Sequence, residues 1–161
     1  MSGICGIWNW DGAPVERSLL TTLSGLLEHR GVDGEARWTD GEIGFAFQNL
    51  WITPESVGTL QPVVRPGESV VMFDGRLDNR DDLLSRLEAC ETISGDSSDA
   101  LLVSALYRRY GDQLADHLNG DFAVAVYDIR ERRLLLARDA LGTRPLYFAH
   151  TPHTFIVASE V

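Results

Sequence analysis

The sequence has no apolar run that approaches the ~18 residues needed to span a bilayer. It also has no basic segment ahead of an apolar one, which is how a secretory signal begins. These two absences predict a cytoplasmic protein with no membrane partner.

Cysteine and basic residues are also scarce. Cys5 and Cys90 are the only two cysteines and lie far apart, which argues against a disulfide framework or a zinc site. The four histidines show no ligand spacing on a shared helix face, so we expect no metal site. Lys and Arg number 14 against 24 Asp and Glu, a net charge of −10. Because a phosphate backbone binds a basic face, we expect no nucleic-acid partner.

The first dozen residues are apolar and favour a β-strand. Residues 4–10 predict a strand buried from the start of the chain and closed by an Asp-Gly turn. Residue 2 is small, so we expect Met1 to be trimmed, which leaves Ser2 as the first residue. A hydroxyl beside a free α-amine is a known nucleophile and base pair, since that amine has a pKa of about 7.7–8.0. The alternative is a terminal strand with no chemical role.

The rest of the chain alternates between helix and strand patterns. A leucine repeat after Pro14 predicts a helix that ends near His29-Arg30, with Gly31 as its C-cap. A short strand at 70–73 should stop at Asp74-Gly75, and Asn79 should cap the next helix. Asp99 should start another helix. Further strands are expected at about 43–52, 122–127, 134–137, 145–149 and 155–158.

The order of these elements predicts an α+β fold. Strands gather at both ends of the chain and helices in the middle, which favours antiparallel sheets over a doubly wound parallel one. The strands at 122–127 and 134–137 are almost entirely apolar, so we expect a sheet on one face and a helix on the other. The last residues stop on or just after a strand, from which we expect a chain cut from a longer one.

Several ordered blocks of the sequence resemble the N-terminal glutaminase domain of the asparagine synthetase family. These blocks are Met1–Ile7, His29–Gly34, Asp74–Arg76, Ser98–Asp99, Leu118–Ala123, Ala137–Tyr147 and Ala158–Glu160. The family is a class II glutamine amidotransferase of the N-terminal-nucleophile hydrolase fold, and the resemblance covers the whole chain. It implies one domain, residues 1–161, folded as a four-layer αββα sandwich of two mainly antiparallel sheets. The family's ATP-dependent synthetase domain is absent here, so ATP and Mg are implied for that domain and no cofactor for this one.

Two departures from the family concern the nucleophile and the substrate carboxylate. The family's N-terminal Cys falls on Ser2, and Cys5 is three residues too late to replace it. A serine hydroxyl is negligibly ionised at neutral pH and depends on its base. The family's Arg that holds the glutamine carboxylate falls on Asn49, and losing a charged hydrogen bond costs about 1.5–3 kcal/mol.

Two further departures concern the oxyanion hole and the substrate-binding residue next to it. The family's oxyanion-hole Asn falls on Asp74, and an ionised carboxylate accepts hydrogen bonds but cannot donate them. The N–H of Gly75 remains for that role. The next family residue, a Glu, becomes Arg76, whereas Asp99, which would hold the glutamine α-amine, is kept. We expect Arg76 to pair with Asp74 or Asp99 and to fill the former substrate site.

We interpret the chain as a degenerate glutaminase domain with a scaffolding role beside a synthetase domain, packed covalently or non-covalently. It is then more similar to the β-lactam synthetase and lasso-peptide cyclase members, which do not take ammonia from glutamine. Glutamine or a peptide is the expected substrate of the whole enzyme. One alternative is a working glutaminase that uses Ser2, and another is a stand-alone module that binds a small molecule or a partner protein. We interpret His29–Gly34 and Arg138–Asp139 as structural turns.

Overall fold

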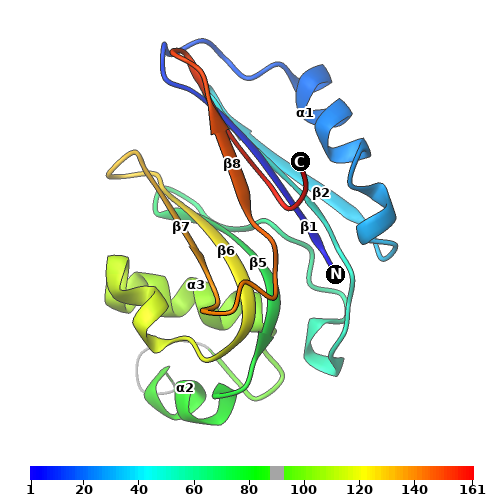
Figure 1. The fold of residues 1–161 in the computed structure, drawn as a ribbon. Helices are drawn as coiled ribbons and strands as arrows, with labels where there is room; N and C mark the ends of the chain where they lie inside the picture. Colours follow the sequence, from blue (N-terminus) through cyan, green and yellow to red (C-terminus); the bar gives the residue numbers. More distant parts are fainter. Residues whose placement is uncertain (88–92) are drawn as a thin grey trace. The chain divides into compact units, whose positions relative to one another are not determined.

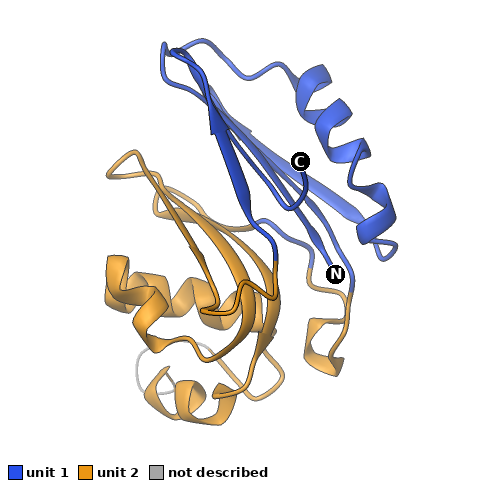
Figure 2. Cartoon of the chain, in the orientation of Figure 1, with its two compact units in different colours: residues 1–50, 60–62, 145–161 blue, residues 51–59, 63–144 orange. Residues whose placement is uncertain are grey.

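The structure is a computed structural model, and it describes residues 1–87 and 93–161. Cys90 lies outside the described residues. The chain forms two compact units (Figure 2). Unit 1 contains residues 1–50, 60–62 and 145–161, and unit 2 contains residues 51–59 and 63–144. Among the described residues, none of the helices combines the length and the apolar character needed to cross a membrane.

Unit 1 is built on a five-stranded antiparallel sheet with strand order β2-β3-β1-β9-β8 (Figure 1). The predicted first strand, β1, is therefore the central strand of this sheet. The elements of unit 1 are β1 (Gly3–Asn9), α1 (Arg17–Gly25), η1 (Glu28–Arg30), β2 (Glu35–Asp40), β3 (Ile43–Gln48), β8 (Tyr147–His150) and β9 (Thr154–Ala158).

Helix α1 packs on strands β1 and β3. Its buried leucine Leu20, together with Leu27, contacts Cys5 and Ile7 on the face of β1 that these alternate residues share. The buried strand β1 confirms the prediction for the start of the chain, although it ends at Asn9 and Trp10 is exposed.

Gly31 is the C-cap of the short 3-10 helix η1, but not of the first α-helix, α1, as predicted. The helix ends at Gly25, and Gly31 has an extended backbone with φ −131° and ψ 101°. A Cβ at Gly31 would lie 2.6 Å from the backbone nitrogen of Asn49. The position therefore requires glycine because the 31–34 segment passes directly against the end of β3.

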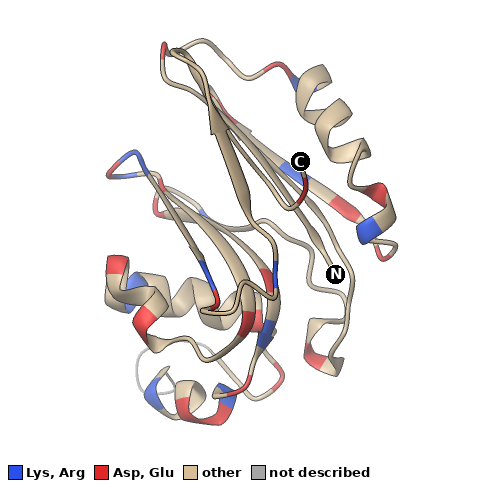
Figure 3. Ribbon diagram, in the orientation of Figure 1, with Lys and Arg blue, Asp and Glu red and all other residues tan. Residues whose placement is uncertain are grey.

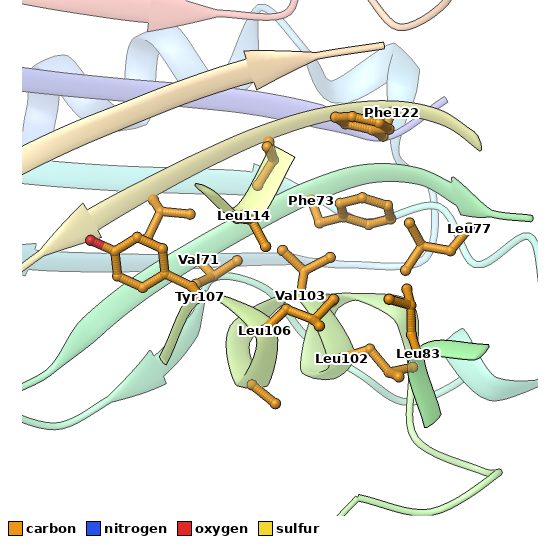
Figure 4. Close-up of a cluster of buried hydrophobic side chains, with 14 of the residues drawn as sticks. Val71, Phe73, Leu77, Leu83, Leu102, Val103, Leu106, Tyr107, Leu114 and Phe122 are labelled. Atoms are coloured by element: carbon orange, nitrogen blue, oxygen red, sulfur yellow. The ribbon is translucent and has the colours of Figure 1, made fainter. Parts of the chain in front are cut away.

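Unit 2 is built on a four-stranded antiparallel sheet with strand order β4-β5-β6-β7. Its helices pack on this sheet and form an apolar core with it. In this core, side chains of β5, α3 and β6 point toward one another (Figure 4). The elements of unit 2 are η2 (Pro54–Ser56), β4 (Val63–Arg65), β5 (Ser69–Leu77), α2 (Arg80–Leu87), α3 (Asp99–Tyr110), η3 (Gly111–His117), β6 (Gly120–Asp128) and β7 (Arg133–Arg138).

Strand β5 does not stop at Asp74-Gly75, as the sequence predicted, but continues to Leu77. Gly75 lies opposite Phe122 of β6, and a Cβ there would overlap the carbonyl oxygen of Asp121. Glycine is thus required for close approach of two strands rather than for a turn, which explains the misinterpretation.

The two long helices of unit 2 begin where the sequence predicted. Asn79 immediately precedes α2, and Asp81 and Asp82 lie in its first turn, where acidic side chains are favourable. The side chain of Asn79 does not cap α2 but donates to the carbonyl of His117 and accepts from Asn119 N–H.

Acidic residues occur in both units (Figure 3).

Candidate functional site

Ser2 is buried at the start of β1, where backbone groups of Leu50 surround its hydroxyl. The hydroxyl accepts a hydrogen bond from Leu50 N–H at 3.1 Å and donates to the Leu50 carbonyl at 3.4 Å. The nitrogen of Ser2 forms a peptide bond with Met1 in this structure, so the α-amino group belongs to Met1. The buried serine is therefore in place, and the base that it needs would appear only on removal of Met1.

Arg30 holds the backbone of residue 2 in position. Its Nε donates to the carbonyl of Ser2 at 2.8 Å, and its Nη1 contacts Glu160 at 2.7 Å. Hydrogen bonds from Arg30 and then from His29 lower the pKa of the Glu160 carboxyl. The His29–Gly34 segment, predicted to be structural, therefore contributes the arginine that holds the Ser2 carbonyl. The sequence analysis placed Arg30 only at a helix end and did not predict its contacts with Ser2 and Glu160.

Cys5 offers no substitute nucleophile. Its thiol is buried under α1, where desolvation and then the nearby charge of Glu35 raise its pKa to about 12. Because the thiolate is the reactive form, a thiol with this pKa is inert at neutral pH.

Asn49 is fixed by backbone groups of unit 1. Its amide nitrogen donates to the carbonyls of Gly34 and Phe47, at 3.2 and 3.4 Å, and its Oδ1 accepts from Gln61 N–H at 3.2 Å. The neighbouring residue, Leu50, is the one that contacts Ser2. Unit 1 therefore brings the predicted residues Ser2 and Asn49 together, with the Asn49 side chain held by the chain itself.

Asp74 lies on β5 in unit 2 and is 2% exposed. Its Oδ1 lies 3.6 Å from Nη1 of Arg144, whose side chain is 13% exposed. This separation makes the contact an ion pair without a short hydrogen bond. A cation at this distance compensates part of the charge of the buried Asp74 carboxylate, whose Oδ2 has no hydrogen-bond partner among the described residues.

The loop after β7 positions Arg144. The Asp139 carboxylate accepts hydrogen bonds from the backbone N–H groups of Leu141, Thr143, Arg144 and Phe122. Burial alone would raise the pKa of Asp139, but these hydrogen bonds outweigh it and lower the pKa to about 2. The predicted structural role of Arg138–Asp139 therefore extends to fixing the backbone that presents Arg144.

Asp99, the first residue of α3, is held by two groups of unit 2. Its Oδ2 accepts from Leu77 N–H at 2.9 Å, and its Oδ1 accepts from Nη1 of Arg80 at 2.6 Å. The two side chains of this ion pair are 11% and 17% exposed, so it is largely shielded from water. The negative charge of Asp99 is therefore neutralised by a short, charged hydrogen bond from Arg80.

The expected pairing of Arg76 with Asp74 or Asp99 is wrong. Arg76 forms an exposed ion pair with Asp78, at 2.8 Å, and its side chain is 58% exposed. Each of these carboxylates instead has another arginine of unit 2 beside it, Arg144 at Asp74 and Arg80 at Asp99. Both belong to elements that only the fold brings to these carboxylates.

Comparisons with known proteins identify the family of this chain. A family model described as a glutamine amidotransferase domain matches residues 1–161. Asparagine synthetase [glutamine-hydrolyzing] 2 of Bacillus subtilis is 30% identical, over 100% of this chain and 22% of that protein. The Zea mays asparagine synthetase is 33% identical, over 82% of this chain and 22% of that protein. The chain thus spans about a quarter of the length of the curated relatives that it matches.

Two solved structures show the fold. Glutamine phosphoribosylpyrophosphate amidotransferase from B. subtilis superposes with a TM-score of 0.75 and 22% identity, over 98% of this chain and 42% of that one. The allosteric regulatory enzyme of purine biosynthesis gives a TM-score of 0.78 and 21% identity over the same shares. The predicted α+β sandwich class with antiparallel sheets is confirmed. The chain belongs to the glutamine amidotransferase domain family, in the branch found in asparagine synthetases.

Proposed function

We propose that the chain is the amidotransferase-like domain of an ATP-dependent, amide-forming enzyme of the asparagine synthetase family, with a degenerate glutaminase site. The observation that carries the proposal is the internal charge matching of both site carboxylates. Asp74 has Arg144 as its counter-ion, and Asp99 has Arg80. Groups that would otherwise face a substrate therefore already have partners within unit 2.

Each step of glutamine hydrolysis would meet an unsuitable group. The nucleophile would be the neutral hydroxyl of Ser2, which already exchanges hydrogen bonds with Leu50. At the position of the family's oxyanion-hole Asn stands Asp74, whose carboxylate cannot donate a hydrogen bond, and removal of one oxyanion-hole donor already costs about 10²–10³ in rate. The substrate carboxylate would meet Asn49, whose amide donates to backbone carbonyls.

The remaining role is structural. In this proposal the domain packs against a synthetase domain, covalently attached as in the much longer relatives, and that domain uses ATP and Mg in the cytoplasm. It would activate a carboxylate for attack by an amine that its own substrate carries, as in the β-lactam synthetase and lasso-peptide cyclase members. Glutamine or a peptide remains the candidate substrate of the whole enzyme.

The second candidate function is an active glutaminase that uses Ser2, and one observation favours it. Arg30 fixes the carbonyl of Ser2 at 2.8 Å, so residue 2 keeps a defined position at the start of a buried strand. Removal of Met1 would then place a free α-amine beside the hydroxyl. A stand-alone binding module stays a third prediction.

Glutamate release from glutamine separates the first two functions. Mass spectrometry first establishes whether Met1 has been removed from the purified chain. The chain and its Ser2→Ala variant are then incubated with glutamine, and we expect glutamate to accumulate at the same background rate in both. Turnover by the unmodified chain that Ser2→Ala abolishes would establish the active glutaminase instead.

A further inference from the structure

Arg80 places its guanidinium among three oxygen atoms of unit 2. Its Nη1 donates to Asp99 Oδ1 at 2.6 Å. Its Nη2 donates to the carbonyl of Gly95 at 2.7 Å and to the carbonyl of Ser97. We name these three oxygens the Asp99 acceptor site. All three can only accept hydrogen bonds, because one belongs to a carboxylate and two to backbone carbonyls.

The Asp99 carboxylate of this acceptor site is oriented by groups other than Arg80. The second carboxylate oxygen of Asp99 accepts from Leu77 N–H at the end of β5. Ser98, the residue before it, caps α3 by accepting from Leu101 N–H. The Asp99 carboxylate is thus oriented by the backbone of two elements, and we expect it to keep its position when Arg80 is truncated.

Three acceptors around one point match the donors of a primary ammonium group. Such a group has three N–H bonds and no acceptor, and its positive charge suits a carboxylate in a site shielded from water. We infer that Arg80 is a specificity-determining residue, which occupies the Asp99 acceptor site and thereby excludes the α-ammonium group of an amino-acid ligand. This inference rests on the proposed function, in which Asp99 no longer binds glutamine.

The internal cation has the advantage over a free one. Arg80 is the first residue of α2, and its side chain is only 17% exposed. Because Arg80 is part of the chain, it occupies the site without the loss of translational freedom that a free ligand would undergo. A group tethered nearby acts at an effective concentration of about the mM range or above. A free ammonium ligand with ordinary affinity therefore cannot displace it, which explains how an intact aspartate at this position can coexist with a closed site.

The test compares two salts on two variants. Arg80→Ala opens the Asp99 acceptor site, and Arg86→Ala is the matched control, because Arg86 lies on the same helix and pairs with Asp82 at the surface. The melting temperature of each protein is measured in methylammonium chloride and in tetramethylammonium chloride at the same concentration. The tetramethylammonium ion has no N–H donor. We expect methylammonium to raise the melting temperature of Arg80→Ala by about 2 °C or more over the control salt. The unmodified chain and Arg86→Ala should show no difference between the salts.

Equal melting temperatures of Arg80→Ala in the two salts would overturn the inference and leave Arg80 as a structural clamp. If Arg80→Ala is unfolded at 25 °C, circular dichroism gives the same decision. Recovery of the folded signal in methylammonium alone supports the site, and no difference between the salts overturns it. Neither readout depends on glutamine hydrolysis. A chain that turned over glutamine would refute the proposed function without changing the salt comparison.

Discussion

The two units hold their predicted site residues in different ways. In unit 1, Ser2 and Asn49 are neutral, and backbone groups satisfy them. In unit 2, Asp74 and Asp99 are carboxylates, and each has an arginine of the same unit beside it. A neutral side chain needs only a hydrogen-bond partner, whereas a buried charge needs a counter-charge. Loss of a partner should therefore cost much more in unit 2 than in unit 1.

The largest effect is expected from Arg144→Met, which leaves the buried carboxylate of Asp74 without its cation. Breaking a buried ion pair on one side costs about 3–5 kcal/mol of stability. The free energy of unfolding in urea gives the cost. The double variant Arg144→Met with Asp74→Asn is the matched control and should recover most of the loss. A double variant as unstable as the single one would show that packing, not charge, dominates.

Asp139 is an intermediate case, since its charge is held by backbone N–H groups and the Thr143 side chain and not by an arginine. We expect Asp139→Asn to lose about 1–3 kcal/mol at pH 7, because several donors lose a charged acceptor. The folded-state pKa of about 2 lies below the ordinary value of 3.8, so this stabilisation is present above pH 4. It should fade as the pH falls from about 4 through 2.

Unfolding measured from pH 7 down to pH 2 tests this assignment. The unmodified chain should lose its advantage over Asp139→Asn across that window. A constant difference between the two proteins over the whole range would contradict the lowered pKa.

Asn49→Leu tests the neutral side of the comparison. The change removes the hydrogen bonds to Gly34 and Phe47 and the acceptor for Gln61 N–H, while the number of side-chain heavy atoms stays the same. A loss of about 1–2 kcal/mol is expected, since no charge is left uncompensated. Urea unfolding again measures it. A loss equal to that of Arg144→Met would erase the difference between the two units.

Arg76→Ala should have the smallest effect. Its ion pair with Asp78 is exposed on both sides, and such pairs contribute about 0–1 kcal/mol. We expect stability within about 0.5 kcal/mol of the unmodified chain. A loss of several kcal/mol would return Arg76 to the role that the sequence analysis first gave it.

The sequence predicted the strongly patterned parts of the fold. The buried first strand, the α2 and α3 starts and the apolar strands β6 and β7 were all found from apolar spacing and capping residues. Strands β2 and β4 were missed. Both are edge strands, with exposed and polar positions that give no strong apolar alternation.

The candidate site was predictable only in part. The residues that depart from the family stand in the sequence, but their partners do not. Arg76 is the cation nearest to Asp74 along the strand, two residues away. Asp78 is equally close to Arg76 in the other direction, and the sequence does not show that Arg76 pairs with Asp78. Arg144 lies far from Asp74 along the sequence and reaches it through a loop that Asp139 organises. A pairing of this kind depends on tertiary structure, which periodicity and capping signals do not encode.

The central claim is that the site is closed by its surroundings and not merely by the loss of a thiol. Ser2→Cys restores the family's nucleophile while Asn49, Asp74 and Arg80 stay in place. With Met1 removal established by mass spectrometry, we predict that this variant releases glutamate from glutamine at the background rate of Ser2→Ala. Enzymatic turnover by Ser2→Cys would contradict the account, because it would show that one atom separates the chain from a working glutaminase.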